Sequence, residues 1–200
     1  MLVAQSRVSG EVQAIDNRQE RGPPLVVMDN VAMDDTPPAP HLLVIWHSRT
    51  GASEALARAA ADAAAEASPA TRLLRADAVS AADLLAAGGY LFVAPENLGS
   101  LSGLMKEMFD RTYYDVLGRI EGRPYATIIA AGSDGAGAER QLDRIVTGWR
   151  LRRMADGLIV NFAAQTPEAI AAPKSLPDKA LKKCREIGGA LAEGQQLGIF

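Results

Sequence analysis

The residues best suited to chemistry in this chain form a hydroxyl-rich loop, Ser48-Arg49-Thr50-Gly51-Ala52-Ser53. Before the loop, residues 41–47 are mostly apolar, as in a buried strand, and after it residues 52–67 have the alanine-rich composition of a helix. The first N–H groups of a helix lack internal partners, and the helix dipole is positive there. Three hydroxyls and a glycine that admits close backbone approach add to this. The loop therefore predicts a phosphate monoester site, although the same residues also suit a helix N-cap without a ligand.

Other phosphate-binding motifs do not match this loop. A nucleoside triphosphatase loop requires a Gly-Lys pair, which the sequence lacks, and a dinucleotide fingerprint requires three spaced glycines where this turn has one. A phosphoacceptor domain would place an aspartate at a strand end, where this chain has His47 and Pro95. Alternation along the first strand places Trp46 and His47 on opposite faces, and each is as well suited to packing as to a ligand.

A second loop follows the β-forming residues 88–94. The loop reads Pro95-Glu96-Asn97-Leu98-Gly99-Ser100. Pro95 is expected to end the strand, Asn97 and Gly99 indicate a turn, and Ser102 is a suitable N-cap for the next helix. That helix has the apolar spacing of a core-facing stripe, at Leu101, Leu104, Met105, Met108 and Phe109.

The two loops together resemble the flavodoxin-like FMN proteins, in particular the NAD(P)H-dependent FMN reductases and NAD(P)H:quinone oxidoreductases. The resemblance covers about residues 42–163 and includes Met105-Lys106 and Phe109-Asp110 after the second loop. It implies that residues 48–53 bind the FMN phosphate and that residues 95–100 lie against the isoalloxazine ring, with Asn97 and the N–H of Gly99 as donors. Ala52 departs from the asparagine of many flavodoxins, a position that contributes mainly its N–H.

A third loop follows the apolar run 123–131 and contains Gly132-Ser133-Asp134-Gly135. In the family, this loop often flanks the other side of the flavin. Such residues also occur in plain connections between strands and helices. Three successive strand ends would converge here, and ligands of open α/β sheets bind outside those ends, for which flavodoxin is itself a standard example.

These elements predict an α/β fold with a three-layer, doubly wound, five-stranded parallel sheet of order 2-1-3-4-5, flavodoxin-like. The second strand is expected near an edge at 71–76 and the fifth at 158–162. A helix at about 138–153 carries arginines on one face, which suit either the phosphate of NADPH or a partner, or a solvated face. These are Arg140, Arg144, Arg150, Arg152 and Arg153.

Composition limits the range of functions. Residues 1–40 contain three arginines and six acidic residues and have the composition of a poorly ordered tail, whereas residues 41–200 contain 18 basic and 18 acidic residues. A neutral domain is a poor nucleic-acid binder and differs from the acidic surfaces of electron-carrier flavodoxins.

No segment is apolar and long enough to cross a membrane, and two histidines make a metal cluster implausible. The single cysteine, Cys184, suits a buried position, and a reducing cytoplasm is the expected location.

The resemblance implies an enzyme in which FMN takes a hydride from NAD(P)H and passes electrons to a quinone, a free flavin or another small acceptor. No catalytic side chain is then expected, because the flavin carries the chemistry. The alternatives are an electron carrier that binds FMN without oxidising NAD(P)H, and a binding module that has lost FMN. Family members are often homodimers or homotetramers, and no apolar stripe here indicates which.

Overall fold

The computed structural model describes residues 41–200, and the tail expected at residues 1–40 lies outside this range. The strands are β1 (His41–Trp46), β2 (Arg72–Arg75), β3 (Ala87–Asn97), β4 (Ser100–Leu101), β5 (Pro124–Ala131), β6 (Arg152–Arg153) and β7 (Leu158–Asn161). The helices are α1 (Ala52–Ala67), the 3-10 turn η1 (Ala76–Ala78), α2 (Ala81–Ala86), α3 (Gly103–Val116), α4 (Ala136–Gly148), α5 (Pro167–Ala171) and α6 (Asp178–Gln196).

The sheet confirms the predicted fold and strand order. Its principal strands run parallel in the order β2-β1-β3-β5-β7, which is 2-1-3-4-5 when the principal strands alone are numbered. The described range also contains the short strands β4 and β6, which the sequence did not predict. Arg152 lies opposite Pro124 and Leu158 opposite Ile128, so six residues of the β6–β7 segment span four of β5. The chain between β6 and β7 therefore bulges away from β5, and the fifth strand expected at 158–162 corresponds to β7.

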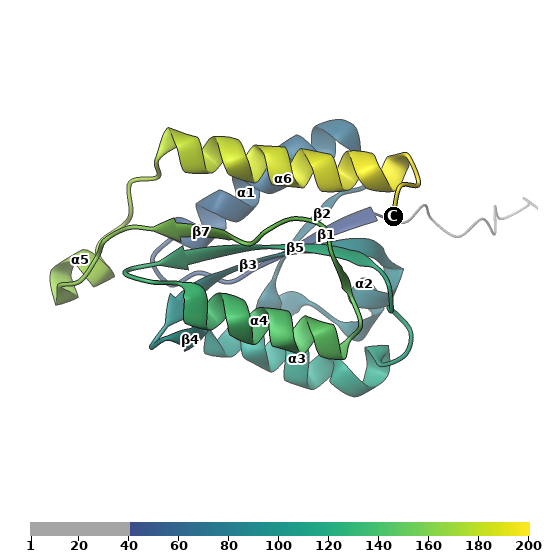
Figure 1. Ribbon diagram of the computed structural model, residues 1–200, viewed down its shortest axis with the longest axis horizontal. Coiled ribbons are helices and arrows are strands. Elements are labelled where there is room, and N and C mark those ends of the chain that lie inside the picture. Colours follow the sequence, from purple (N-terminus) through teal and green to yellow (C-terminus); the bar gives the residue numbers. More distant parts are fainter. Residues whose placement is uncertain (1–40) are drawn as a thin grey trace, which may run out of the picture. The chain divides into compact units, whose positions relative to one another are not determined.

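Helices cover both faces of the sheet (Figure 1). Leu42 and Val44 of β1 pack toward α1 and α6, whereas Leu43 and Ile45 pack toward α2, α3 and α4. This alternation follows from the two-residue period of a strand, and burial on both faces explains why the central strands are almost wholly apolar. A Cβ on Gly188 of α6 would lie 2.1 Å from the Ala60 carbonyl oxygen of α1, so the small residues of these helices permit their close packing.

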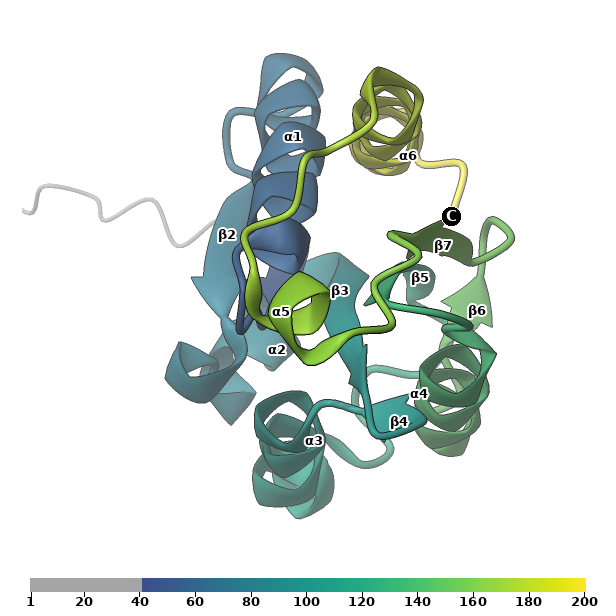
Figure 2. The same cartoon turned by 90° about the vertical axis from the view of Figure 1, so that its left-hand side faces the viewer.

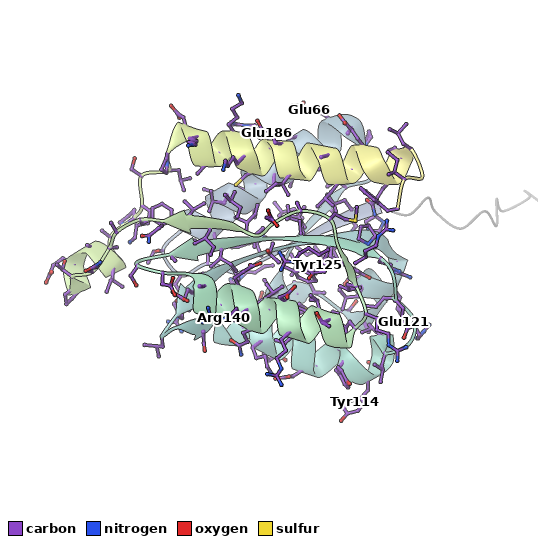
Figure 3. The ribbon with its side chains drawn as sticks, in the orientation of Figure 1. Glu66, Tyr114, Glu121, Tyr125, Arg140 and Glu186 are labelled. Atoms are coloured by element: carbon purple, nitrogen blue, oxygen red, sulfur yellow. The ribbon has the colours of Figure 1, made fainter. Side chains whose placement is uncertain are left out.

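Two predicted boundaries were wrong. Strand β3 does not end at Pro95 but continues to Asn97, because the chain turns back there and pairs with β4 as an antiparallel hairpin. Helix α4 ends at Gly148 rather than near residue 153, and Arg152 and Arg153 belong to β6 instead. Tyr125 lies in the core on the α4 side of the sheet, and its hydroxyl donates a hydrogen bond to Asp143 of α4 (Figure 3).

Candidate functional site

Two adjoining hollows lie at the carboxyl ends of β1, β3 and β5, the edge of the sheet that faces the viewer in Figure 2. The inner hollow, against Ser48, Thr50 and Ser53, has a volume of about 130 Å³. The hairpin hollow, against the β3–β4 turn, has a volume of about 810 Å³. The hairpin hollow falls within the range of about 300–1,000 Å³ common for small-molecule sites. Together they offer a small space beside the hydroxyl-rich loop and a wider space along the hairpin.

Most residues expected at the site line one or both hollows. They are Ser48, Arg49, Thr50, Ala52, Ser53, Pro95, Glu96, Asn97, Leu98, Gly99, Ser100, Gly132 and Ser133. Gly51, Asp134 and Gly135 do not line them. Gly51 and Gly135 instead occupy the N-cap positions of α1 and α4, each with a positive φ near 90°. The loops therefore converge as expected, and the role of each residue toward a ligand stays a prediction.

The start of α1 has unused hydrogen-bonding capacity. Gly51 is its N-cap, with φ 88°, and no side chain caps the helix. The Gly51 N–H donates to the Ser48 hydroxyl at 3.0 Å, which curls the loop around the helix end. Ser53 is only 1% exposed, lines the inner hollow, and its hydroxyl has no hydrogen-bond partner among the described residues. Because a buried hydroxyl without a partner is costly, this atom indicates a polar ligand at the start of the helix.

The hairpin between β3 and β4 carries a strained tip. Asn97 pairs with Ser100, and the two residues between them, Leu98 and Gly99, have φ values of 53° and 68°. Positive φ at both central positions is typical of a type I′ turn, in which asparagine or aspartate followed by glycine is the usual pair. Leu98 is fully exposed, at 105%, and lines the hairpin hollow. An exposed leucine in the left-handed region is uncommon and marks this tip as a functional candidate.

The Glu96 carboxylate fills the start of α4. It accepts hydrogen bonds from the N–H groups of Gly135 at 2.7 Å, Gly137 at 3.1 Å and Ala138 at 3.3 Å. A Cβ on Gly137 would lie 2.1 Å from the carbonyl oxygen of Gly99, so α4 also packs directly against the hairpin turn. The start of α4 is thus capped by the Glu96 side chain, whereas no side chain caps α1 or α3. The first residues of α1, Ala52 and Ser53, line the inner hollow, and the first residue of α3, Gly103, lines the hairpin hollow.

His47, between β1 and the first loop, is buried and packs at the strand end. Burial lowers its pKa below the ordinary value of 6.5, and the positive charges of Arg75 and Arg49 lower it further. The imidazole is therefore neutral at neutral pH. Its Nδ1 is hydrogen-bonded to the Ser102 hydroxyl. Ser102 is the N-cap of α3, as expected, but its side chain does not cap that helix.

Several lining residues were not among those expected. They are Ala130, Ala131, Phe162, Ala164, Ile170 and Lys174 in the inner hollow, and Leu101 and Gly103 in the hairpin hollow. Ala130 and Ala131 end a predicted strand and Phe162 follows another, so the rule that ligands bind at strand ends could have identified them. Ile170 and Lys174 lie in a connection without periodic pattern, and no sequence signal placed it over the hollow.

The arginine face expected on the helix at 138–153 is not formed as one surface. Arg140 and Arg144 are exposed on α4, where Figure 3 labels Arg140. Arg153 instead forms ion pairs of 2.8 Å with Glu139 and with Asp143. Arg153, one of the cations expected to bind the phosphate of NADPH along this helix, is therefore paired with acidic residues of α4 instead.

Two kinds of feature are absent from residues 41–200. No helix in this range is long and apolar enough to span a membrane. Within the same described part of the chain, no three His, Cys, Asp or Glu side chains are grouped as they would be around a metal ion. Cys184 is buried in α6, as expected, and burial raises the pKa of its thiol to about 12.

The sequence matches a protein family and a curated relative, both of the flavodoxin-like type. The family described as NADPH-dependent FMN reductase matches residues 60–165, just over half of the chain, starting beyond the first loop. A flavodoxin from Aquifex aeolicus (strain VF5) is 30% identical over 159 residues, covering 76% of this chain and 85% of its own.

Solved structures share the fold. A flavodoxin from the domain Archaea superposes with a TM-score of 0.63 at 16% identity, over 78% of this chain and 99% of that one. A flavodoxin, WrbA-like protein from Agrobacterium tumefaciens gives 0.56 at 17% identity, over 79% and 98%. At such identities the superpositions support the fold alone.

Proposed function

Because this chain belongs to the NADPH-dependent FMN reductase family of flavodoxin-like proteins, we propose that it is an FMN-dependent oxidoreductase that oxidises NAD(P)H. Its electrons pass through the flavin to a quinone, a free flavin or another small acceptor. The family is FMN-binding, whereas the nucleotide donor and the acceptor are our proposal.

The buried Ser53 hydroxyl carries the proposal. It lies at the uncapped start of α1, where free N–H groups and the helix dipole suit one phosphate group. The corresponding end of α4 is filled by Glu96, and the start of α3 lines the hairpin hollow instead, so the inner hollow offers one helix end for a phosphate. A mononucleotide such as FMN suits this arrangement better than a dinucleotide, whose pyrophosphate needs a longer cradle.

Bound FMN supplies the hydride and electron transfer, and the protein binds and orients it. The loop at 48–53 would hold the phosphate with hydroxyls and helix N–H groups. The hairpin would lie along the ring, with the Asn97 side chain and the Gly99 N–H as proposed donors to polar ring atoms. Such donors stabilise negative charge that develops on the ring during reduction. Gly132 and Ser133 would border the ring from β5.

An electron-carrier role is the second candidate, since the Aquifex aeolicus relative is named flavodoxin. Two features of the chain favour the reductase. Residues 41–200 carry balanced charge instead of the strongly acidic surface of dedicated carriers, and the loop at 95–100 lacks the Trp or Tyr expected of them.

The visible absorption spectrum of the purified protein tests the proposal. We expect flavin bands, either as purified or after addition of FMN, which bleach when NADPH or NADH is added without oxygen. Bleaching followed by recovery on addition of a quinone would identify the acceptor class. Flavin bands that persist with both nucleotides would favour the electron carrier, and a protein that takes up no FMN would contradict both functions.

A further inference from the structure

The connection between β7 and α6 crosses the edge of the sheet that carries the site. Helix α5 lies within this segment, residues 162–177, and stands in front of the strand ends in Figure 2. The Thr166 hydroxyl caps α5 by accepting a hydrogen bond from the Ala169 N–H at 3.2 Å. Ile170 and Lys174 of this segment line the same inner hollow as the loop at 48–53. The segment therefore brings a cation to the proposed phosphate end.

Lys174 is held in place without a carboxylate. Its ammonium donates hydrogen bonds to the carbonyl oxygens of Ala169 at 2.7 Å, Ile170 at 2.9 Å and Ala172 at 2.5 Å. These carbonyls lie at the end of α5, where a helix has no internal donors for them. Among the described residues, no ion pair includes Lys174. The Lys174 ammonium is therefore held beside the hollow, but no carboxylate among the described residues neutralises its positive charge.

The charge of the inner hollow also favours an anion. Its charged lining residues are Arg49, Glu96 and Lys174. Glu96 is the one negative group among them, and its carboxylate is directed to the backbone of α4. A phosphate monoester carries roughly −1.5 to −2 charges at pH 7. Two cations are therefore available for it, Arg49 from the loop at 48–53 and Lys174 from the segment that contains α5.

We propose that Lys174 is a ligand of the phosphate group of the bound flavin, supplied by the segment that covers the site. This inference rests on the proposed function. Hydrogen bonds between an ammonium and a phosphate are stronger than those to neutral carbonyls, and the lysine side chain is long and flexible. The ammonium therefore turns from the α5 carbonyls toward the phosphate when FMN binds. Lys174 then contributes to the affinity for FMN but not to that for riboflavin, which has the same ring and no phosphate.

The test compares the dissociation constants of FMN and riboflavin, measured by quenching of flavin fluorescence. The variants are Lys174→Met, Lys174→Arg and the control Lys179→Met, an exposed lysine of α6 outside both hollows. We expect Lys174→Met to weaken FMN binding about tenfold or more and riboflavin binding less than about twofold. Lys174→Arg keeps the charge and should retain most of the FMN affinity. Lys179→Met should change neither constant, and the salt dependence of FMN binding should be shallower in Lys174→Met.

Each other outcome has a distinct meaning. Equal weakening of FMN and riboflavin in Lys174→Met would show that the lysine only holds the covering segment in place, and would overturn the inference. Unchanged FMN binding in this variant would also overturn it, while leaving the proposed function intact. A wild-type protein that binds neither flavin would instead contradict the proposed function, and the inference with it.

Discussion

The Nδ1 atom of His47 lies 2.8 Å from the Ser102 hydroxyl, in a buried hydrogen bond between residues 55 positions apart. His47 directly precedes the loop at 48–53, and Ser102 directly follows the hairpin strand β4. The bond therefore joins the loop expected to hold the phosphate to the loop expected to hold the ring. This hydrogen bond therefore helps to fix the relative position of the two loops independently of any ligand.

Replacing Ser102 tests how much this bond stabilises the fold. In Ser102→Ala, the buried Nδ1 of His47 loses its partner, which costs about 1–3 kcal/mol for a polar group left unsatisfied. We expect the free energy of unfolding in urea to fall by that amount. Ser175→Ala, at an exposed serine, is the control and should change it by less than about 0.5 kcal/mol. Equal stabilities for the two variants would show that the bond has no net effect.

The lowered pKa of His47 predicts a dependence of stability on pH. Above about pH 6.5 the imidazole is neutral in both states, and its contribution is fully present. As the pH falls below 6.5, the unfolded chain binds the proton first, so stability decreases until the pH passes the folded pKa. The decrease is at most about 1.4 kcal/mol per pH unit.

The difference in unfolding free energy between wild type and His47→Gln isolates this effect. Glutamine does not titrate, and the other buried histidine, His41, is present in both proteins, so its own lowered pKa cancels. We expect the advantage of the wild type to shrink between pH 7.5 and pH 5. A difference that stays constant over this range would contradict a neutral, buried His47.

Glu96 is expected to hold the hairpin against α4. In Glu96→Gln, one amide oxygen must replace two carboxylate oxygens that accept three N–H groups. We expect a loss of about 1–3 kcal/mol and faster hydrogen exchange at Gly135 and Gly137. Glu107→Gln removes only an exposed ion pair with Arg111 and should cost less than about 0.5 kcal/mol. Unchanged exchange at the two glycine amides would mean that solvent replaces the carboxylate without loss.

Thr50 tests the phosphate loop directly. A glutamate at this half-buried position would place a negative charge beside the phosphate, and like charges about 4 Å apart repel by about 4 kcal/mol near a protein surface. Thr50→Glu should therefore weaken FMN binding at least about a hundredfold while the circular dichroism spectrum is unchanged. Thr50→Ser keeps the hydroxyl and should bind FMN nearly as the wild type does. A Thr50→Glu protein that purifies with stoichiometric flavin would refute the assignment.

The positions of the loops could be predicted from sequence because each depends on short-range patterns. Apolar runs identified the strands, and parallel strands must end at the same edge, which brings residues 48–53, 95–100 and 132–133 together. The contacts that organise the site could not be predicted in this way. The hydrogen bond that the Gly135 N–H donates to Glu96 spans 39 positions, and neither residue carries a local signal for the other.

Strand β3 shows a further limit of local rules. Proline usually ends a strand, but Pro95 lies opposite Ala130 of β5, and the chain beyond it is held by the hairpin pairing with β4. Helix α5 has only five residues and buries none of them, so no amphipathic pattern in the sequence indicated this helix. Lys174 was missed for the same reason, since its place depends on where that unpatterned segment crosses the sheet edge.

Leu98 combines backbone strain with exposure. This combination predicts that replacing Leu98 raises the stability of the fold and lowers the activity. Its left-handed conformation costs about 1–2 kcal/mol for an ordinary L-residue, and its exposed side chain recovers little by burial. Leu98→Asn creates the Asn-Gly pair that type I′ turns favour, so we expect the unfolding free energy to rise by about 0.5–1 kcal/mol.

Because Leu98 lines the hairpin hollow, the same change should lower kcat/KM for an apolar quinone severalfold, since one apolar contact contributes about 1–2 kcal/mol. The rate with ferricyanide, a polar acceptor, should stay within about twofold. Leu117→Asn makes the same chemical change at an exposed leucine outside both hollows and should alter neither rate. A Leu98→Asn protein that is more stable and reduces quinones as well as the wild type would show that the strained leucine does not contact the acceptor.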